Sequence, residues 1–206
     1  MKYKIVRDKS ELHKITTPVG TIEEGNEIAA KLLECLSELK YGIGLSANQI
    51  GIPKSVSVVK ARKDAPALIL MNPSIIERSK EFVIYQEGCL SLPGKIVSTI
   101  RSRKVTVSTL NHANPLSFGP TENTDDVQKL GYDEGLLESV CVQHEVGHLY
   151  GKLITDEGIR FIPPAKQAKV KHGRNDKVLL VKGTESQYIK YKFALDLVEK
   201  EGWVIA

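Results

Sequence analysis

Residues 135–151 read GLLESVCVQHEVGHLYG, the segment around which the rest of the chain can be arranged. Its apolar residues and its length predict a helix, and His144-Glu145-Val146-Gly147-His148 within it is an H-E-x-x-H sequence. Residues four apart lie on one face of a helix, so both imidazoles can bind the same metal ion. Glu145 is then placed to accept a proton from water bound to that ion.

Two histidines do not complete a catalytic metal site, which usually has three protein ligands and one open position. The sequence offers Cys89 in EGCLS, residues 87–91. This cysteine follows a predicted strand and stands beside Gly88, which lets a backbone or a ligand come close. A thiolate next to a divalent cation is deprotonated, and this adds affinity. A buried core cysteine is the alternative interpretation.

A second glycine-rich segment is GIGLSANQ, residues 42–49. A G-x-G sequence is most often a turn, and this one lacks the third glycine and the preceding strand of a dinucleotide-binding loop. We expect a loop that presents the side-chain amide of Gln49 to a substrate.

These three segments, in this order, resemble the signatures of the peptide deformylase family. The resemblance extends from about Ile15 to Leu153, roughly two-thirds of the chain. It implies a metal-dependent hydrolase that removes the N-formyl group from the N-terminal formyl-methionine of nascent polypeptides and releases formate. It also implies Fe²⁺ as the physiological ion, with Zn²⁺, Ni²⁺ or Co²⁺ as substitutes. Affinity alone generally favours zinc over ferrous iron.

The resemblance also assigns roles to residues of this chain. It makes Cys89, His144 and His148 the metal ligands and Glu145 the general acid and base. Gln49 and the backbone N–H of Leu90 would stabilise the oxyanion. The residues that would lie along the bound peptide or line the pocket for its methionine side chain are Ile43, Gly44, Tyr85, Gly88, Leu137, Val140 and Cys141.

Several positions depart from the family pattern. Gly147 stands where the family usually has an aspartate, so Arg101, which would help to bind that acidic cluster, must turn to Glu87 or elsewhere. Ile96 stands where many members have arginine at the pocket rim. Residues 111–134 are longer than the usual connection, and the chain after about residue 165 does not match the common C-terminal helix.

Two other classes of protein are compatible with part of the sequence. A zincin-like metallopeptidase also uses H-E-x-x-H, but Ile154 stands where the extended motif has a third histidine. Glu157 could be proposed as a ligand instead, yet this leaves EGCLS and GIGLSANQ unexplained. A non-catalytic binding protein is the other alternative, supported only by Gly147 and the altered tail.

The remaining pattern predicts an α+β fold, with small antiparallel or mixed sheets around the metal-binding helix. Residues 1–164 would form the catalytic domain. Thr21 and Glu24 fit a capping box, and apolar residues at helical spacing predict a helix over 22–40 that includes Cys35 as a core residue. Strands are expected at 55–61, 67–71, 81–85 and 103–110, and 111–134 is expected to be a polar surface connection.

Composition indicates an ordinary globular protein of 206 residues, with 41% hydrophobic and 26% charged residues. No segment approaches the ~20 apolar residues that a membrane span needs, and the N-terminus lacks an export signal. We therefore expect a cytoplasmic monomer without contact to a membrane. Its three cysteines cannot all pair, which favours a reducing compartment.

The C-terminal residues 165–206 form a basic appendage. They hold nine Lys and Arg against five Asp and Glu, which accounts for the whole net charge of +4. Strands are expected at 178–182 and 187–192, followed by a helix at 194–201 and an apolar end at 203–205. One interpretation is a hairpin that covers a sheet edge with solvated lysines. The other is an RNA-binding surface that meets the ribosome.

Overall fold

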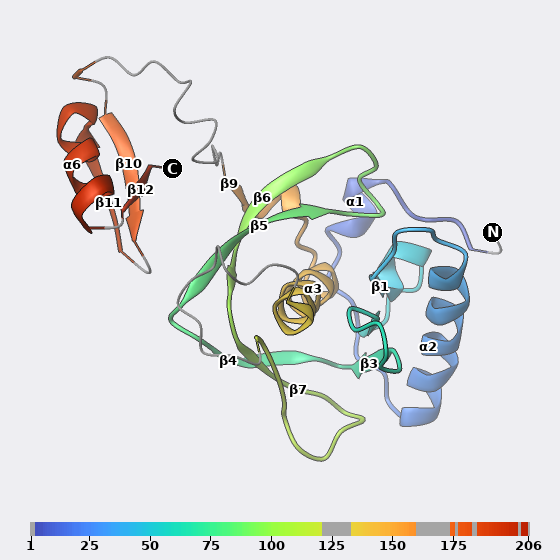
Figure 1. Ribbon diagram of the computed structural model, residues 1–206. Coiled ribbons are helices and arrows are strands. Elements are labelled where there is room, and N and C mark those ends of the chain that lie inside the picture. Colours follow the sequence, from blue (N-terminus) through green and yellow to red (C-terminus); the bar gives the residue numbers. More distant parts are fainter. Residues whose placement is uncertain are drawn as a thin grey trace.

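The computed structural model describes residues 3–120, 133–159, 174–175, 177–182, 185–201 and 203–205. Three small sheets and the long helix α2 (Ile22–Ser37) lie around a central helix, α3 (Glu134–Leu149) (Figure 1). The expected α+β class and the central helix are thus confirmed. The strand pairs of the described residues are antiparallel, and an isolated bridge between Thr17 and Lys54 is parallel.

Helix α3 is held from nearly all sides. It begins after Asp133, whose side chain accepts a hydrogen bond from the Leu136 backbone N–H at 2.8 Å. Its fully or largely buried residues include both apolar side chains and polar ones, among them Gln143, Glu145 and His148. Burial on this scale explains why α3 shows no clean polar face, and it fixes the side chains of the H-E-x-x-H motif.

Helix α2 packs its apolar stripe on the first sheet. Thr21 accepts a hydrogen bond from the Glu24 backbone N–H at 3.1 Å, as a capping box requires. The Glu24 carboxylate, however, accepts from the backbone N–H of Gly20 and not from that of Thr21. The helix ends at Ser37, three residues before the expected end, and Cys35 is buried in its core face as expected.

The three sheets have three strands each. The first contains β1 (Gly44–Ser46), β2 (Val56–Val59) and β3 (Leu68–Met71). The second contains β4 (Ser74–Arg78), β7 (Val105–Ser108) and β8 (Leu116–Phe118). The third contains β5 (Phe82–Gly88), β6 (Ile96–Ser102) and β9 (Gly158–Ile159). Each expected strand of this region is present, although shifted by a few residues at its ends.

Several elements were not expected from the sequence. They are α1 (Lys9–Leu12), η1 (Ala47–Ile50), α4 (Ile154–Glu157) and strands β1, β4, β6, β8 and β9. The interpretation of 111–134 as a mere surface connection is wrong at its start, because β8 pairs with β7 and buries Phe118. Such short strands form because a neighbour offers them hydrogen bonds, which a local pattern does not reveal. Residues 121–132 lie outside the described residues.

The tail contains the expected hairpin and helix. Strand β10 (Lys177–Lys182) pairs with β11 (Glu185–Lys190) and with β12 (Val204–Ile205). Helix α6 (Tyr191–Glu201) begins directly after β11, so the expected strand at 187–192 is displaced by two residues toward the C-terminus. The tail has its own apolar cluster, whose buried members are Val178, Leu180, Ala194 and Trp203. Residues 160–173 lie outside the described residues.

Two global features complete the fold. Among the described residues, no helix is both long and apolar enough to cross a membrane. The three cysteines, Cys35, Cys89 and Cys141, are all described, buried and free of disulfide bonds. One of them, Cys89, lies at the centre of the molecule beside α3.

Candidate metal centre and substrate pocket

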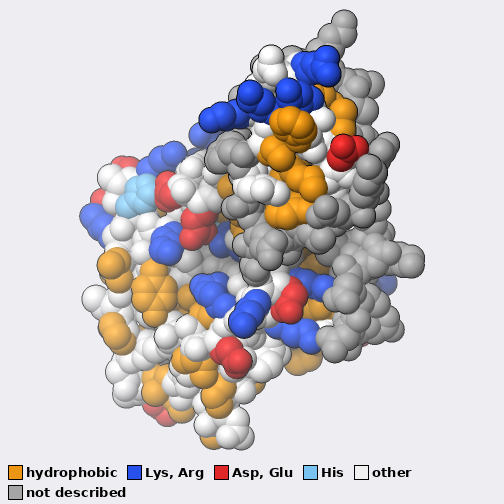
Figure 2. Space-filling view, turned by 90° about the vertical axis from the view of Figure 1, so that its left-hand side faces the viewer, with side chains coloured by type: hydrophobic (Ala, Val, Ile, Leu, Met, Phe, Trp, Pro, Cys, Tyr) orange, Lys and Arg blue, Asp and Glu red, His pale blue; other side chains and the backbone are white. Residues whose placement is uncertain are grey.

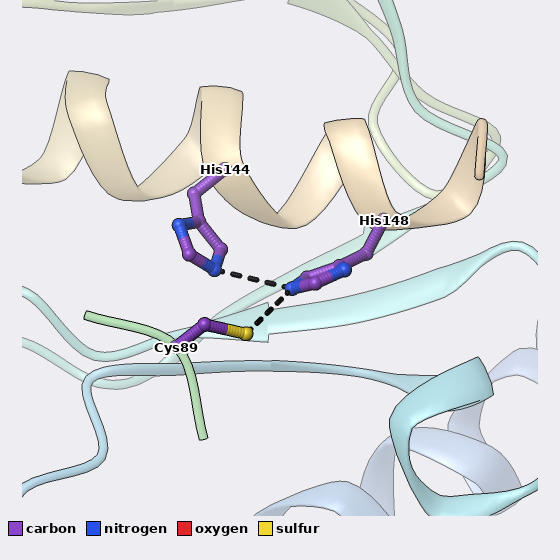
Figure 3. A group of neighbouring side chains, drawn as sticks. All are labelled: Cys89, His144 and His148. Atoms are coloured by element: carbon purple, nitrogen blue, oxygen red, sulfur yellow. Dashed lines mark hydrogen bonds between the residues drawn. The ribbon is translucent and has the colours of Figure 1, made fainter. Parts of the chain in front are cut away.

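Two histidines and one cysteine meet beside the central helix (Figure 3). His144 and His148 extend from one face of α3, and Cys89 follows directly after β5. His148 Nε2 lies 3.1 Å from His144 Nε2 and 3.3 Å from Cys89 Sγ. All three potential ligand atoms lie within 4.8 Å of one another. The structure thus brings together the residues that the sequence suggested as ligands.

These separations suit a single four-coordinate ion. Metal–sulfur bonds of about 2.3 Å and metal–nitrogen bonds of about 2.0 Å place tetrahedral ligand atoms about 3.3–3.6 Å apart. Two of the separations, 3.1 and 3.3 Å, lie close to that range, and the third pair lies within 4.8 Å. One thiolate and two imidazoles leave one position of the tetrahedron for water, which is the arrangement of catalytic sites. The donor set therefore fits a divalent transition metal.

Glu87 fixes the orientation of His144. Its Oε2 accepts a hydrogen bond from His144 Nδ1 at 2.7 Å, so that Nε2 faces the other two ligand atoms. Burial raises the pKa of Glu87, but hydrogen bonds from His144 and Arg101 outweigh burial and lower that pKa to about 2. An ionised carboxylate therefore stands behind this histidine and increases its basicity.

The two histidines differ in their affinity for protons. Burial lowers the pKa of His144, but hydrogen bonds with Cys89 and Glu87 outweigh it and raise the pKa to about 10. Burial and the neighbouring His144 lower the pKa of His148 well below its usual value. Because Nδ1 of His144 faces Glu87, a cation bound at Nε2 would have to displace the proton there. Metal binding is thus coupled to proton release.

Glu145 lies next to these ligands and faces strand β1. Its Oε2 accepts a hydrogen bond from Ser46 Oγ at 2.7 Å, and its side chain is almost fully buried. Burial raises the pKa of Glu145, while His144 and the hydrogen bond from Ser46 lower it in part. A carboxylate with a raised pKa is suited to accept and return a proton near neutral pH.

Gln49 is held from both ends of its amide. Its Oε1 accepts a hydrogen bond from the Ser46 backbone N–H at 2.9 Å, which leaves Nε2 as the group that faces the site. Nε2 lies 3.2 Å from Ser91 Oγ and 3.6 Å from Cys89 Sγ. Gln49 belongs to the short helical turn η1, whereas the sequence predicted a loop. Its donor group is aimed at the cysteine.

One pocket of about 500 Å³ opens on these residues. Its walls come from β5, the segment after β5, the turn before β1, and helix α3. Every residue that the sequence suggested for substrate binding lines it: Ile43, Gly44, Tyr85, Gly88, Leu137, Val140 and Cys141. Leu90, Gln49 and Glu145 line it too. Ile96 also lines it and is 68% exposed, which places an apolar side chain at the rim.

Arg101 forms hydrogen bonds with two carboxylates, those of Glu87 and Glu157, whereas Gly147 has no side chain to offer it. Its Nε and Nη2 donate to Glu87 at 2.6 and 3.2 Å, and its Nη1 donates to Glu157 at 2.7 Å. Thr99 donates a short hydrogen bond to the same Glu87 carboxylate. Burial lowers the pKa of Arg101, but the two glutamates outweigh it and raise the pKa above its usual value.

Several residues that support the site were not expected from the sequence. They are Ser46, Ser91 and Thr99, together with Glu157 in its role as a partner of Arg101. Ser46 and Ser91 stand inside the GIGLSANQ and EGCLS segments, so those segments could have pointed to them. Thr99 and Glu157 belong to no motif, and only the pairing of β6 with β5 and β9 places them beside Glu87 and Arg101.

Comparison with known proteins agrees with this geometry. The family model described as polypeptide deformylase matches residues 2–161. A peptide deformylase from Hamiltonella defensa subsp. Acyrthosiphon pisum is 34% identical over 161 residues, covering 77% of this chain and 83% of the relative. One from Borreliella burgdorferi is 37% identical over 130 residues, covering 63% and 70%.

Solved structures show the same fold. The peptide deformylase of Thermotoga maritima superposes with a TM-score of 0.62 at 26% identity, covering 77% of this chain and 98% of that one. A probable peptide deformylase from Synechococcus phage S-SSM7 gives 0.61 at 27% identity, covering 75% and 99%. With a family model that matches most of its length and a relative 34% identical over 77% of it, the chain belongs to the peptide deformylase family.

Proposed function

We propose that Cys89, His144 and His148 hold the catalytic metal ion of this deformylase and that Glu145 is its general acid and base. As a family member, the chain removes the N-formyl group from the N-terminal formyl-methionine of nascent polypeptides and releases formate. The observation that carries the residue assignment is the meeting of three ligand atoms within 4.8 Å, beside a buried carboxylate on the wall of one pocket.

Hydrolysis of a formamide needs an activated water, because the formyl carbon is a poor electrophile. A bound divalent ion supplies this by lowering the pKa of water toward ~7, and it polarises the formyl oxygen. Glu145 accepts the proton of the attacking water and then passes it to the leaving amine as the C–N bond breaks. Ser46, 2.7 Å from its Oε2, keeps that carboxylate in place through both transfers.

The negative charge that develops on the formyl oxygen needs hydrogen-bond donors. We assign this role to Gln49 Nε2 and to the backbone N–H of Leu90. Because Ser46 N occupies the oxygen end of the Gln49 amide, the N–H₂ end is already turned toward the site. One such donor, preorganised, can contribute ~3 kcal/mol to the barrier in other hydrolases.

The methionine side chain of the substrate fits the apolar part of the pocket. Its wall residues are Ile43, Tyr85, Leu137, Val140 and Cys141. Ile43, Gly44 and Gly88 lie along the path of the peptide backbone. The apolar walls favour an unbranched apolar side chain and disfavour a charged one, which would lose its hydration without a partner.

We propose Fe²⁺ as the physiological ion, with Zn²⁺, Ni²⁺ or Co²⁺ as replacements. A Cys–His–His set would hold zinc readily, so aerobic purification favours the wrong ion. Protein purified anaerobically should contain one iron per chain and release formate from a formyl-Met peptide. Zinc in the anaerobic protein, with full activity, would contradict the assignment of iron.

The same assay separates the two alternative classes. A metallopeptidase would cleave the peptide bond and leave the formyl group in place, and a binding protein would release nothing. Ile154, where the extended peptidase motif has histidine, is buried in α4 and offers no ligand atom. Glu157 is engaged by Arg101. The described residues thus provide no substitute for the Cys89 ligand.

For the tail we propose an electrostatic contact with the surface of the ribosome, because the substrate is a nascent chain that emerges at that surface. The family match ends at residue 161, and the positive net charge lies beyond it. Lys177 and Lys190 are directly opposite each other across the hairpin, a like-charge pair that destabilises a sheet unless an anion offsets it. In Figure 2, Lys and Arg side chains gather at the top of the molecule, where the tail lies.

Charge reversal tests this partner. Lys177→Glu with Lys190→Glu should abolish salt-sensitive co-sedimentation with ribosomes and leave cleavage of a short formyl-Met peptide unchanged. The matched control is Lys31→Glu with Lys80→Glu, two exposed lysines of the catalytic part that give the same change in net charge. Equal loss in both pairs, or no association of the unmodified protein at low salt, would leave the hairpin with a purely structural role.

A further inference from the structure

Glu157 is a carboxylate outside helix α3 that is linked to the candidate metal centre through Arg101. Glu157 is the last residue of α4, the short helix that follows α3. Its Oε2 accepts a hydrogen bond from Arg101 Nη1 at 2.7 Å. The side chain of Arg101 is 8% exposed and that of Glu157 is 31% exposed, so the pair lies at the edge of the core.

Arg101 is the link between Glu157 and the metal centre. Its Nε and Nη2 donate to the two oxygens of Glu87. The same carboxylate also accepts hydrogen bonds from Thr99 Oγ1 and, at 2.7 Å, from His144 Nδ1. The N–H donors of a guanidinium lie in one rigid plane. A carboxylate bound at Nη1 therefore also fixes the direction in which Nε and Nη2 donate to Glu87. The orientation of His144 therefore depends on a chain of three charged hydrogen-bonded groups that ends at Glu157.

The backbone on either side of Glu157 is fixed by hydrogen bonds that bring this residue close to strand β6. Asp156 accepts a hydrogen bond from the Leu153 backbone N–H at 2.8 Å and so fixes α4. Directly after Glu157, β9 pairs with β6, the strand that carries Arg101, through Gly158 opposite Thr99. A Cβ at Gly158 would lie 2.3 Å from Val97 Cγ1, so glycine is what lets the two strands come this close.

Gly147 contributes no side chain to this network, although it stands between the two histidines of the motif. We propose that Glu157 is a positioning residue of the metal centre, which holds Arg101 and, through Glu87, the imidazole of His144. This inference rests on the proposed metal site. Glu157 touches neither a ligand atom nor the pocket, so its effect must pass through Arg101.

The experiment follows the loss of metal from enzyme loaded with Co²⁺ into excess chelator, together with formate release. Replacing a group that hydrogen-bonds a metal ligand typically lowers metal affinity or activity ~10–100-fold. Glu157 acts through one further residue, so we expect a smaller effect of about 3–10-fold on the same quantities. Glu157→Gln should therefore lose Co²⁺ about 3–10-fold faster, with a lower kcat and an unchanged KM. Lys152→Met is the matched control, because Lys152 is the exposed partner of Glu157, at 3.7 Å, and should change neither rate.

A double substitution tests whether the effect passes through Arg101. Arg101→Lys keeps the positive charge but cannot bind both glutamates with a planar fork. In that background, Glu157→Gln should add no further acceleration of metal loss. An equal effect in both backgrounds overturns the proposal, and so does Glu157→Gln protein that melts earlier while its rate of metal loss and its kcat remain normal.

Failure of the metal site itself has a different signature. Cys89→Ala should bind no stable Co²⁺ if the proposed ligand set is right. Should Cys89→Ala retain the ion as the unmodified protein does, the ligand assignment is wrong. Should it lose the ion while Glu157→Gln releases it at the normal rate, the ligands stand and the role of Glu157 falls.

Discussion

Ser46 Oγ lies 2.7 Å from Glu145 Oε2, and this contact joins the GIGLSANQ segment to the H-E-x-x-H helix. Ser46 is fully buried, and its hydroxyl also lies 2.9 Å from the backbone oxygen of Glu145. The single hydroxyl proton is shared between these two oxygens, and both belong to the residue that we propose as the general base. Burial raises the pKa of Glu145, and the hydrogen bond from Ser46 lowers it in part, although less than the neighbouring His144 does.

Replacing Ser46 with alanine should change the pH dependence of catalysis. The hydrogen bond from Ser46 lowers the pKa of Glu145 against the effect of burial, so its loss should raise that pKa further. Because the proposed base must be ionised to accept a proton, the acidic limb of the kcat/KM profile should move to higher pH. Ser57→Ala is the control, since Ser57 Oγ is buried and has no hydrogen-bond partner among the described residues. If the acidic limb of the kcat/KM profile does not shift in Ser46→Ala, a group other than Glu145 determines that limb.

Glu145→Gln should retain the metal and lose most turnover, because the change removes the proton acceptor but no ligand. General acid–base catalysis contributes typically ~10²–10⁴-fold, so the rate of formate release should fall within that range. Metal content by elemental analysis should remain one ion per chain. Near-normal formate release would identify a different base.

Gly44→Ala should impair catalysis far more than stability. A Cβ at Gly44 would lie 2.5 Å from Glu145 Oε1 and 2.7 Å from Cys141 Sγ, so the carboxylate must move. A displacement of ~1 Å at a catalytic group can lower the rate ~100-fold. We expect kcat to fall by about that factor with little change in Tm. Gly20→Ala, whose Cβ would approach only Glu24 Oε2 at 3.9 Å, should leave both quantities unchanged.

Substrate choice should follow the apolar walls of the pocket. Formyl-Met peptides should be cleaved with a higher kcat/KM than formyl-Gly peptides, which bury no side chain, and formyl-Asp peptides should be the poorest. Burying a methionine side chain contributes about 1.5–3 kcal/mol, or roughly 10–150-fold in kcat/KM. Equal values for all three peptides would show that the methionine side chain binds elsewhere.

The tail should unfold separately from the catalytic part. Its apolar cluster is small, and Trp203, the single tryptophan of the chain, is buried in it. Tryptophan fluorescence therefore reports the tail alone. In a urea titration it should change at a lower concentration than formate release is lost, because so small a core stabilises little. Coincident transitions would argue against 1–164 and 165–206 as separate units.

The proposed ligand set could be predicted from the sequence alone. Four-residue spacing on a helix puts His144 and His148 on one face whatever surrounds that helix, so two ligands follow from local geometry. Cys89 and Gln49 followed from the resemblance of their segments to a known family, and their chemistry suits the site. The capping of α2 at Thr21 and the hairpin of the tail were also local, and the structure contains both.

The contacts that support these groups could not be predicted without the three-dimensional fold. Ser46 meets Glu145 across 99 positions of the chain, and Arg101 meets Glu157 across 56. No periodicity encodes such contacts, because they arise from the pairing of short strands such as β6 and β9, which form only when a neighbour satisfies their backbone hydrogen bonds. The proposed ligands could thus be predicted from local spacing and from the resemblance of short segments, whereas the buried charges that orient them depend on how distant segments pack.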